Sequence, residues 1–233
     1  MSSLGRISAA LATAVLVTGV AAAPDASAQQ SVNLFLGGFV PRAEDARGTD
    51  DELFVAHDFL TYDFGKFTGP TIGAEWIVPV NYWIDASVGI GYYQRTAPSF
   101  YSDLVTEQGA DIEQDLKLRV APFTATFRVL PLGRGAALRP YFGAGVGVLS
   151  WRYSETGSFV DFDDTIYRDA FVASGAEVGP VFLGGLTVPV GHVDIGGEIR
   201  HQSGRGALPE DQFFAPSIDL GGTSYLLVFN VRF

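Results

Sequence analysis

The C-terminal stretch Gly221–Phe233, GGTSYLLVFNVRF, decides the fold. A β-strand sends successive side chains to opposite faces, so residues two apart share a face. One face of this stretch is continuously apolar and consists of Thr223, Tyr225, Leu227, Phe229, Val231 and Phe233. The other face carries small or polar residues such as Ser224, Asn230 and Arg232, with Leu226 and Val228 between them. In a membrane barrel, lipid-facing and lumen-facing residues alternate in this way. The stretch therefore predicts a strand with one face in lipid.

Seven further segments of the chain have the length and alternation of strands. They are Ser31–Pro41, Pro70–Val80, Trp83–Thr96, Asp115–Leu130, Arg139–Val148, Gly175–Val190 and His192–Gln202. Long connections are expected at Arg42–Gly69, Ala97–Gln114, Ser154–Ser174 and Ser203–Ser217, and short turns at 81–82, 131–137 and 191. Membrane barrels have an even number of strands, short periplasmic turns and long extracellular loops. The sequence thus predicts an all-β protein, an eight-stranded antiparallel transmembrane β-barrel of up-and-down topology.

Charged residues fall on the faces opposite the apolar ones. A soluble barrel would show the reverse arrangement, apolar inside and polar outside. We expect these charges to pair across the lumen, because a buried unpaired charge is costly. The expected luminal charge network consists of Glu75, Asp85, Arg95, Arg128, Glu177, Asp194, Glu198 and Arg200, with Arg139 near the periplasmic rim. Such a network either plugs the barrel or forms a narrow path for protons or small ions.

The fourth segment, Asp115–Leu130, fits this pattern less well. Phe123 and Phe127 are expected to face lipid, but the same phase turns Lys117 and Arg119 outward. Either these two cations lie above the hydrocarbon, or a bulge at Pro122 resets the register.

Composition and the N-terminal segment set the location of the protein. Residues 1–28 have the short positive start, apolar core and Ala26-Ser27-Ala28 site of a secretory signal peptide. The barrel is then residues 29–233. Beyond the signal, no apolar run approaches the roughly 18 to 20 residues of a spanning helix. The net charge of −11 argues against nucleic acid as a partner, and the absence of cysteine excludes disulfides and thiolate metal sites.

Two motifs carry a family resemblance. The chain ends in alternating aromatics with Phe233 last, and residues 140–147 read P-Y-x-G-x-G-x-G. In both respects the sequence resembles the small eight-stranded outer-membrane β-barrels of bacteria. The resemblance implies an outer-membrane location and an assembly signal, Tyr225, Phe229 and Phe233, read by the barrel-assembly machinery. It also implies outer-membrane lipid and lipopolysaccharide as surroundings, and Lys117 and Arg119 are candidates to contact lipopolysaccharide phosphates. We expect a monomer without cofactor or metal, acting as a structural or surface protein or as a narrow porin-like barrel.

An enzymatic alternative comes from Arg200-His201-Gln202-Ser203. The segment is similar to the His-x-Ser pattern of lipid A 3-O-deacylases, which are outer-membrane lipid hydrolases with eight-stranded barrels. A serine nucleophile needs a base within reach and an acid that orients the base. His201 and Ser203 share a face of the strand, and Glu210 is the nearest downstream carboxylate. The family motif continues with Asn, where this chain has Gly204.

The carboxylates of one acidic loop are candidate ligands for Ca²⁺ or Mg²⁺. The run Asp161-x-Asp163-Asp164 lacks the glycine and the distal glutamate of a calcium loop, so a solvated loop is expected there.

Overall fold

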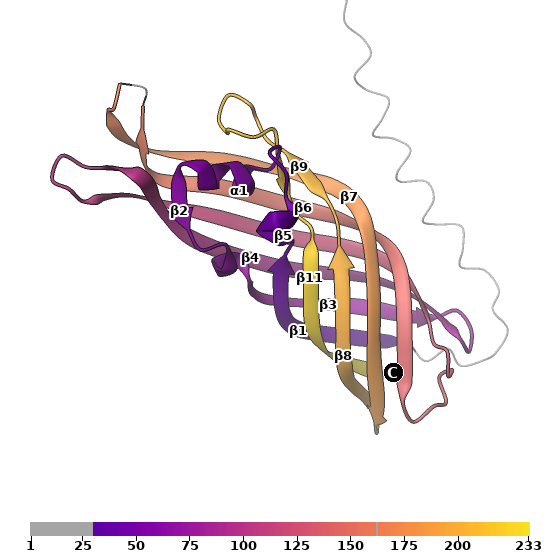
Figure 1. Cartoon of the computed structure of the whole chain (residues 1–233). Coiled ribbons are helices and arrows are strands. Elements are labelled where there is room, and N and C mark those ends of the chain that lie inside the picture. The colour runs from indigo at the N-terminus through magenta and orange to yellow at the C-terminus, as the bar shows by residue number, and fades with distance from the viewer. Residues whose placement is uncertain (1–29, 162) are drawn as a thin grey trace, which may run out of the picture.

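The computed structural model describes residues 30–161 and 163–233, so the predicted signal peptide, residues 1–28, lies outside the described residues (Figure 1). Eight strands form the body of the protein. They are β1 (Ser31–Pro41), β3 (Gly69–Pro79), β4 (Ile84–Val105), β5 (Asp111–Val129), β6 (Arg139–Val160), β7 (Ile166–Val190), β8 (Val193–Gln202) and β11 (Gly222–Arg232). Among the helices of the described residues, none is long and apolar enough to cross a membrane.

The eight strands close into an antiparallel ring. Their order is β4-β3-β1-β11-β8-β7-β6-β5, and a further pairing joins β5 back to β4. The first and last strands meet side by side, with Ser31 opposite Arg232 and Pro41 opposite Gly222. Every backbone polar group of such a ring can pair with a neighbouring strand, which is the condition for spanning lipid. The predicted eight-stranded antiparallel barrel is confirmed.

Large apolar side chains cover the outside of the ring near the chain termini. Ile72 is 62% exposed, Phe127 is 64% exposed and Val178 is 73% exposed. Thr71 and Arg128, the adjacent residues on their strands, point inward and are buried, as does Val181, three residues from Val178 on β7. A broad exposed apolar surface is costly in water but favourable in lipid. This apolar band marks the membrane-spanning part of the barrel.

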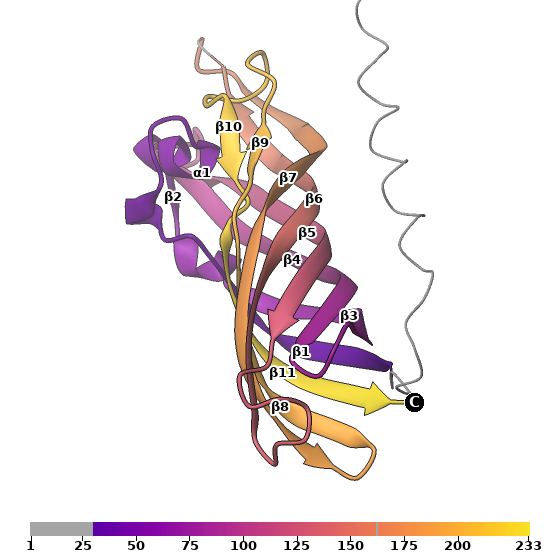
Figure 2. The same cartoon turned by 90° about the vertical axis from the view of Figure 1, so that its right-hand side faces the viewer.

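One wall of the barrel is much taller than the other. Strands β4, β5, β6 and β7 have 19 to 25 residues, whereas β1, β3, β8 and β11 have 10 or 11. Figures 1 and 2 show the long strands rising past the short ones, away from the C-terminus. We call this part of the wall, beyond the apolar band, the extension. It lies on the side opposite the short turns.

The extension corrects two of the predicted loops. Most of Ala97–Gln114 and of Ser154–Ser174 is strand, and the connections are only residues 106–110 and 161–165. The sequence suggested loops because the outward face becomes polar there. A strand that leaves lipid for water keeps its backbone pairing while its outer side chains become hydrophilic.

Strand β5 shows this change of polarity within one unbroken strand. In the extension, Leu116, Leu118 and Val120 point inward and are buried, while Lys117 and Arg119 are exposed outside. In the membrane part the same outward positions are apolar and the inward positions are polar: Phe123 and Phe127 lie outside, and Thr124 and Thr126 lie inside. The register against β4 and β6 is the same on both sides of Pro122. The alternative of a bulge at Pro122 is therefore wrong, and the two cations lie above the apolar band.

Two chain segments cover the inner side of the extension. The first, residues 42–68, contains η1 (Glu44–Ala46), α1 (Glu52–Val55), η2 (Ala56–Asp58), β2 (Leu60–Tyr62) and η3 (Phe64–Phe67). The second, residues 203–221, contains the paired strands β9 (Arg205–Ala207) and β10 (Ser217–Asp219). Both were predicted as long loops, but they fold back against the wall. We call them the first and second cover segments.

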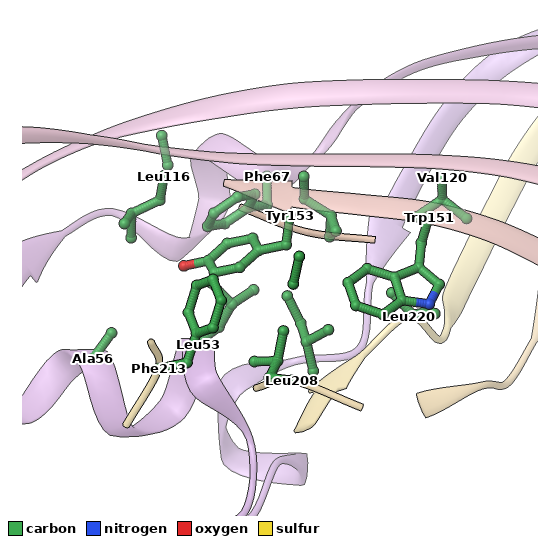
Figure 3. Close-up of a cluster of buried hydrophobic side chains, with 14 of the residues drawn as sticks. Leu53, Ala56, Phe67, Leu116, Val120, Trp151, Tyr153, Leu208, Phe213 and Leu220 are labelled. Carbon is green, nitrogen blue, oxygen red and sulfur yellow. The ribbon is translucent and has the colours of Figure 1, made fainter. Parts of the chain in front are cut away.

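A buried apolar cluster joins the cover segments to the wall. Figure 3 shows Leu53 and Phe67 of the first segment with Leu208 and Phe213 of the second, around Tyr153 of β6. Tyr153 is fully buried. This is the largest buried apolar cluster of the described residues. Because burying apolar surface stabilises a fold by roughly 25 cal/mol per Å², it is the main hydrophobic core. It fills the upper half of the molecule.

Candidate functional site

The lumen below the apolar cluster is filled by a compact charge network. Glu75 of β3 pairs with Arg128 of β5 and, at 3.1 Å, with Arg200 of β8. Glu198 of β8 pairs with the same two arginines, at 3.4 Å and 2.6 Å. The four side chains carry two negative and two positive charges, and none of these residues is more than 7% exposed. We call them the central quartet.

Hydroxyl and amide groups add hydrogen bonds to the carboxylates of the quartet, whereas Arg128 Nε is buried without a hydrogen-bond partner among the described residues. Ser87 donates to Glu75 over 2.7 Å, and Asn33 donates to the same carboxylate over 3.4 Å. Tyr141 donates to Glu198 over 2.9 Å, and its ring lies 5.0 Å from the guanidinium carbon of Arg128. Buried ions are tolerated only when paired and hydrogen-bonded in this way.

A second group of charges lies at the rim of the barrel beside the short turns, which was predicted to be periplasmic. Asp194 pairs with Arg139 at 3.1 Å and with Arg232 at 3.4 Å, and Asp85 pairs with Arg134. The rim charges therefore form pairs of their own and do not join the central quartet. These ion pairs lie at the lower end of the lumen and close it.

Six of the eight predicted luminal charges thus occur in ion pairs, but Arg95 and Glu177 are not brought into the network. Arg95 lies in the extension, where its Nε donates to the carbonyl oxygen of Lys66 over 3.2 Å. Glu177 is half-buried on β7, and within the described part of the chain it forms no ion pair.

Sequence reasoning missed three contributors to the lumen. Arg134 lies in a predicted turn, and Arg232, although on the predicted inward face of the terminal strand, is not part of the predicted charge network. The hydroxyl of Tyr141 belongs to the P-Y-x-G-x-G-x-G segment, which indicated only a family resemblance. Alternation within β6 was the available signal for Tyr141, because it shares a face with Gly143 and Gly145.

A second polar site is buried where the cover segments meet the extension. Glu52 of α1 and Glu155 of β6 are both buried, and their carboxyl groups are neighbours. Glu52 Oε2 accepts the backbone N–H of Ala215 over 2.7 Å, and Glu155 Oε1 accepts the hydroxyl of Tyr153 over 2.7 Å. The pair thus links both cover segments to the wall.

The protonation of this carboxyl pair is perturbed. Burial raises the pKa of Glu155 to about 7, and the neighbouring charge of Glu52 adds to the rise. Burial also raises the pKa of Glu52, while the Ala215 N–H opposes this change. Arg47, a basic group of the same cover segment, is paired with Asp51 at 2.9 Å. The two carboxyls therefore share protons near neutral pH.

The residues of the enzymatic alternative lie on the outer face, at the upper end of β8. Ser203 Oγ is 3.4 Å from His201 Nε2. His201 Nδ1 is 3.1 Å from the hydroxyl of Thr223, which stands opposite it on β11. Glu210 is exposed, and no hydrogen bond or ion pair joins it to His201 within the described chain. The structure brings the serine and histidine together but places a threonine where a triad needs an acid.

The acidic loop considered for a metal forms a turn instead. Asp163 accepts the backbone N–H of Thr165 over 3.1 Å, and Asp164 has a φ of 61°. Within residues 30–161 and 163–233, no three His, Asp or Glu side chains gather as metal ligands would.

Comparison with solved structures bears on the fold. The outer membrane protein OprG from Pseudomonas aeruginosa aligns with a TM-score of 0.51 and 11% identity, over 88% of this chain and 96% of that one. The chain has the fold of a small bacterial outer-membrane β-barrel. Its exposed apolar band agrees with the predicted outer-membrane location.

Two other outer-membrane proteins align less closely. Neisserial surface protein A aligns with a TM-score of 0.43 and 11% identity, over 88% of this barrel and 97% of that chain. Ail of Yersinia pestis aligns with a TM-score of 0.40 and 10% identity, over 88% and 99%. No protein-family model and no curated protein matches the sequence.

Proposed function

We propose that this barrel is a non-enzymatic surface protein whose lumen is closed by its own side chains and whose extension is the functional part. The central quartet carries this proposal. An eight-stranded barrel has an interior just wide enough for side chains to fill, and here paired charges from β3, β5 and β8 occupy it.

The apolar cluster adds a second closure above the first. An ion crossing the barrel would meet paired charges in the lower half and a dry cluster in the upper half. Between these layers lies a cavity of about 20 Å³, lined by residues including Phe39, Tyr93 and Arg200. Such a cavity holds about one water molecule. This arrangement favours a sealed barrel over the porin-like alternative.

Planar-bilayer conductance tests the proposal. The unmutated protein should give no stable current steps. A variant that combines Glu198→Ser and Arg200→Ser in the quartet with Leu208→Ser and Phe213→Ser in the apolar cluster weakens both closures and should produce measurable steps. Current steps from this variant would also show that the protein inserts into the bilayer under the conditions of the assay. A matched control, Ile199→Ala, changes the lipid-facing residue between Glu198 and Arg200 and should stay silent. Stable steps from the unmutated protein would refute the sealed barrel.

The lipid-facing side of the terminal strand is exposed and aromatic. Tyr225 is 56% exposed and Phe233 is 67% exposed on the lipid side of β11, with half-buried Phe229 between them. We propose that this face is the assembly signal recognised by the barrel-assembly machinery, that outer-membrane lipid and lipopolysaccharide surround the band, and that the barrel acts as a monomer. A single copy closes its own sheet and leaves no edge in the ring.

A lipid hydrolase is the second candidate, and the contact of Ser203 with His201 favours it. The hydroxyl of Thr223 fixes the histidine ring but supplies no negative charge to stabilise an imidazolium. We therefore rank it below the sealed barrel. Incubation with lipopolysaccharide tests it through release of a 3-hydroxy fatty acid. Ser203→Ala should abolish release while the barrel stays heat-modifiable, and absence of release by the unmutated protein ends this alternative.

A further inference from the structure

Three cations are gathered on the outer face of the extension. Lys117 and Arg119 belong to β5 and Arg152 to β6, and all three are exposed. Arg119 stands directly opposite Arg152 in the register, and Lys117 lies two residues farther along the same face. In a protein with a net charge of −11, this is a local concentration of positive charge. We call it the basic patch.

Without a bound anion, the basic patch lowers the stability of the barrel. Like charges directly opposite each other on neighbouring strands destabilise a sheet. Within the described residues, none of the three cations takes part in an ion pair or a hydrogen bond. Their cross-strand neighbours on the same face, Gln94 and Thr96 of β4, are uncharged. An outward carboxylate, Asp115, comes only two residues beyond Lys117 and forms no ion pair with it.

Position along the strands identifies the surroundings of the patch. The outward pair Phe123 and Val148 belongs to the apolar band and stands four residues below Arg119 and Arg152. Four residues of strand cover about 13 Å, and Ala121 and Ser150 lie between. The cations therefore sit immediately above the hydrocarbon, at the level of lipid headgroups. They lie on the side of the long strands, which faces the outside of the cell.

The chemistry of the three side chains selects an anionic partner. A guanidinium presents a planar fork of donors that binds phosphate with two parallel hydrogen bonds, and an ammonium binds it as a point charge. Two forks facing one another with a third cation beside them match a phosphorylated headgroup. The outer leaflet of this membrane consists of lipopolysaccharide, whose lipid A anchor carries phosphates at this depth.

We propose that Lys117, Arg119 and Arg152 form a binding site for the phosphate groups of lipid A. The inference rests on the proposed orientation of the barrel in the outer membrane and is independent of whether the lumen is sealed. A bound phosphate neutralises the opposed arginines, so the lipid becomes part of the wall between β5 and β6.

Native mass spectrometry of the purified barrel in detergent tests the site. Phosphorylated lipid A, dephosphorylated lipid A and phosphatidylglycerol are titrated separately, and bound lipids are counted. The unmutated protein should retain phosphorylated lipid A in preference to the other two. Each change of Lys117, Arg119 or Arg152 to Gln should weaken binding about fivefold, and the triple variant about 100-fold.

Arg168→Gln is the matched control. Arg168 is an exposed residue of β7 that pairs with Ser158, six residues beyond Arg152 on β6, or about 20 Å farther from the band. It should leave binding unchanged. An equal loss with Arg168→Gln, unchanged binding by the triple variant, or equal retention of dephosphorylated lipid A would each overturn the site. Equal retention of phosphatidylglycerol would overturn its assignment to lipid A. Heat-modifiability on gels shows that every variant is folded, which separates loss of the site from failure of the barrel.

Discussion

The carboxyl pair of Glu52 and Glu155 predicts that the cover segments loosen as the pH rises. The pKa of buried Glu155 is raised to about 7 from its ordinary value of 4.5. The closed form therefore holds a proton that the open form releases, so that its stability falls with increasing pH. The effect is absent below pH 4.5, develops between pH 4.5 and 7, and is complete above pH 7.

The size of the effect follows from the difference of 2.5 between the two pKa values. At about 1.4 kcal/mol for each pKa unit, the closed form loses about 3 kcal/mol across this range. That corresponds to roughly a 300-fold increase in the population of opened cover segments. The effect is local, because the pair lies outside the membrane part and the strands of the ring do not depend on it.

Hydrogen exchange measures this opening directly. The amides of Phe54 and Val55 bond to Asp51 within α1, and the amide of Ala215 bonds to Glu52. Their protection, corrected for the intrinsic pH dependence of exchange, should fall between pH 4.5 and 7 and stay constant above that range. Amides of β1 and β11 should keep theirs.

Glu155→Gln removes the titrating group and should make protection of these amides nearly independent of pH. Glu113→Gln is the control, because Glu113 is an exposed carboxylate on the outward face of β5. A pH dependence that survives in Glu155→Gln, or flat protection in the unmutated protein, would refute the reasoning.

Three shorter predictions test the barrel itself. Deleting Phe233, or changing it to Lys, should reduce assembly, measured as the heat-modifiable fraction in outer membranes; normal assembly would argue against the terminal signal. Glu198→Ala leaves Arg200 with a weakened set of partners and should lower the free energy of unfolding by about 3–5 kcal/mol in denaturant titrations, as should Asp194→Ala to a smaller extent at the less enclosed rim. Ile195→Asp places a charge in lipid and should block insertion, so equal tolerance at Ile195 and Glu198 would show that the assignment of faces is wrong.

The barrel was predictable because its membrane part obeys a simple alternation. The faces assigned to Ile72, Glu75 and the terminal residues from Tyr225 onward agree with their exposure. Lipid contact fixes the outward residues, and strand period fixes the rest.

The extension was not predictable by the same rule. Alternation of β5 continues beyond Val120, but its apolar face changes from outside to inside as the strand enters water. A rule that expects apolar residues on the outer face of every strand therefore predicts a loop in this part of the chain. The reversal itself is visible in the sequence between Leu116 and Phe123, and it marks the height of the membrane surface.

The site required contacts that no local pattern contains. Glu52 and Glu155 are more than one hundred residues apart, and only the folding of residues 42–68 back onto β6 brings them together. The same holds for Thr223, which faces His201 because β8 and β11 are neighbours in the ring.

In the proposed orientation, with the extension outside the cell, the unequal wall heights determine which residues a bacterial cell presents first to its environment. Strands β6 and β7 share 22 residue pairs, whereas β7 and β8 share 10. On β7 the fifteen residues 166–180 lie beyond Val181, the last residue paired with β8, and they extend the hairpin by about 50 Å along the strands, or about 38 Å in height at a tilt near 40°. An antibody, a phage or a neighbouring cell would therefore meet the acidic tip at residues 161–165 before it reached the short strands. Changes at this tip alter recognition of the cell while leaving the membrane part of the barrel untouched.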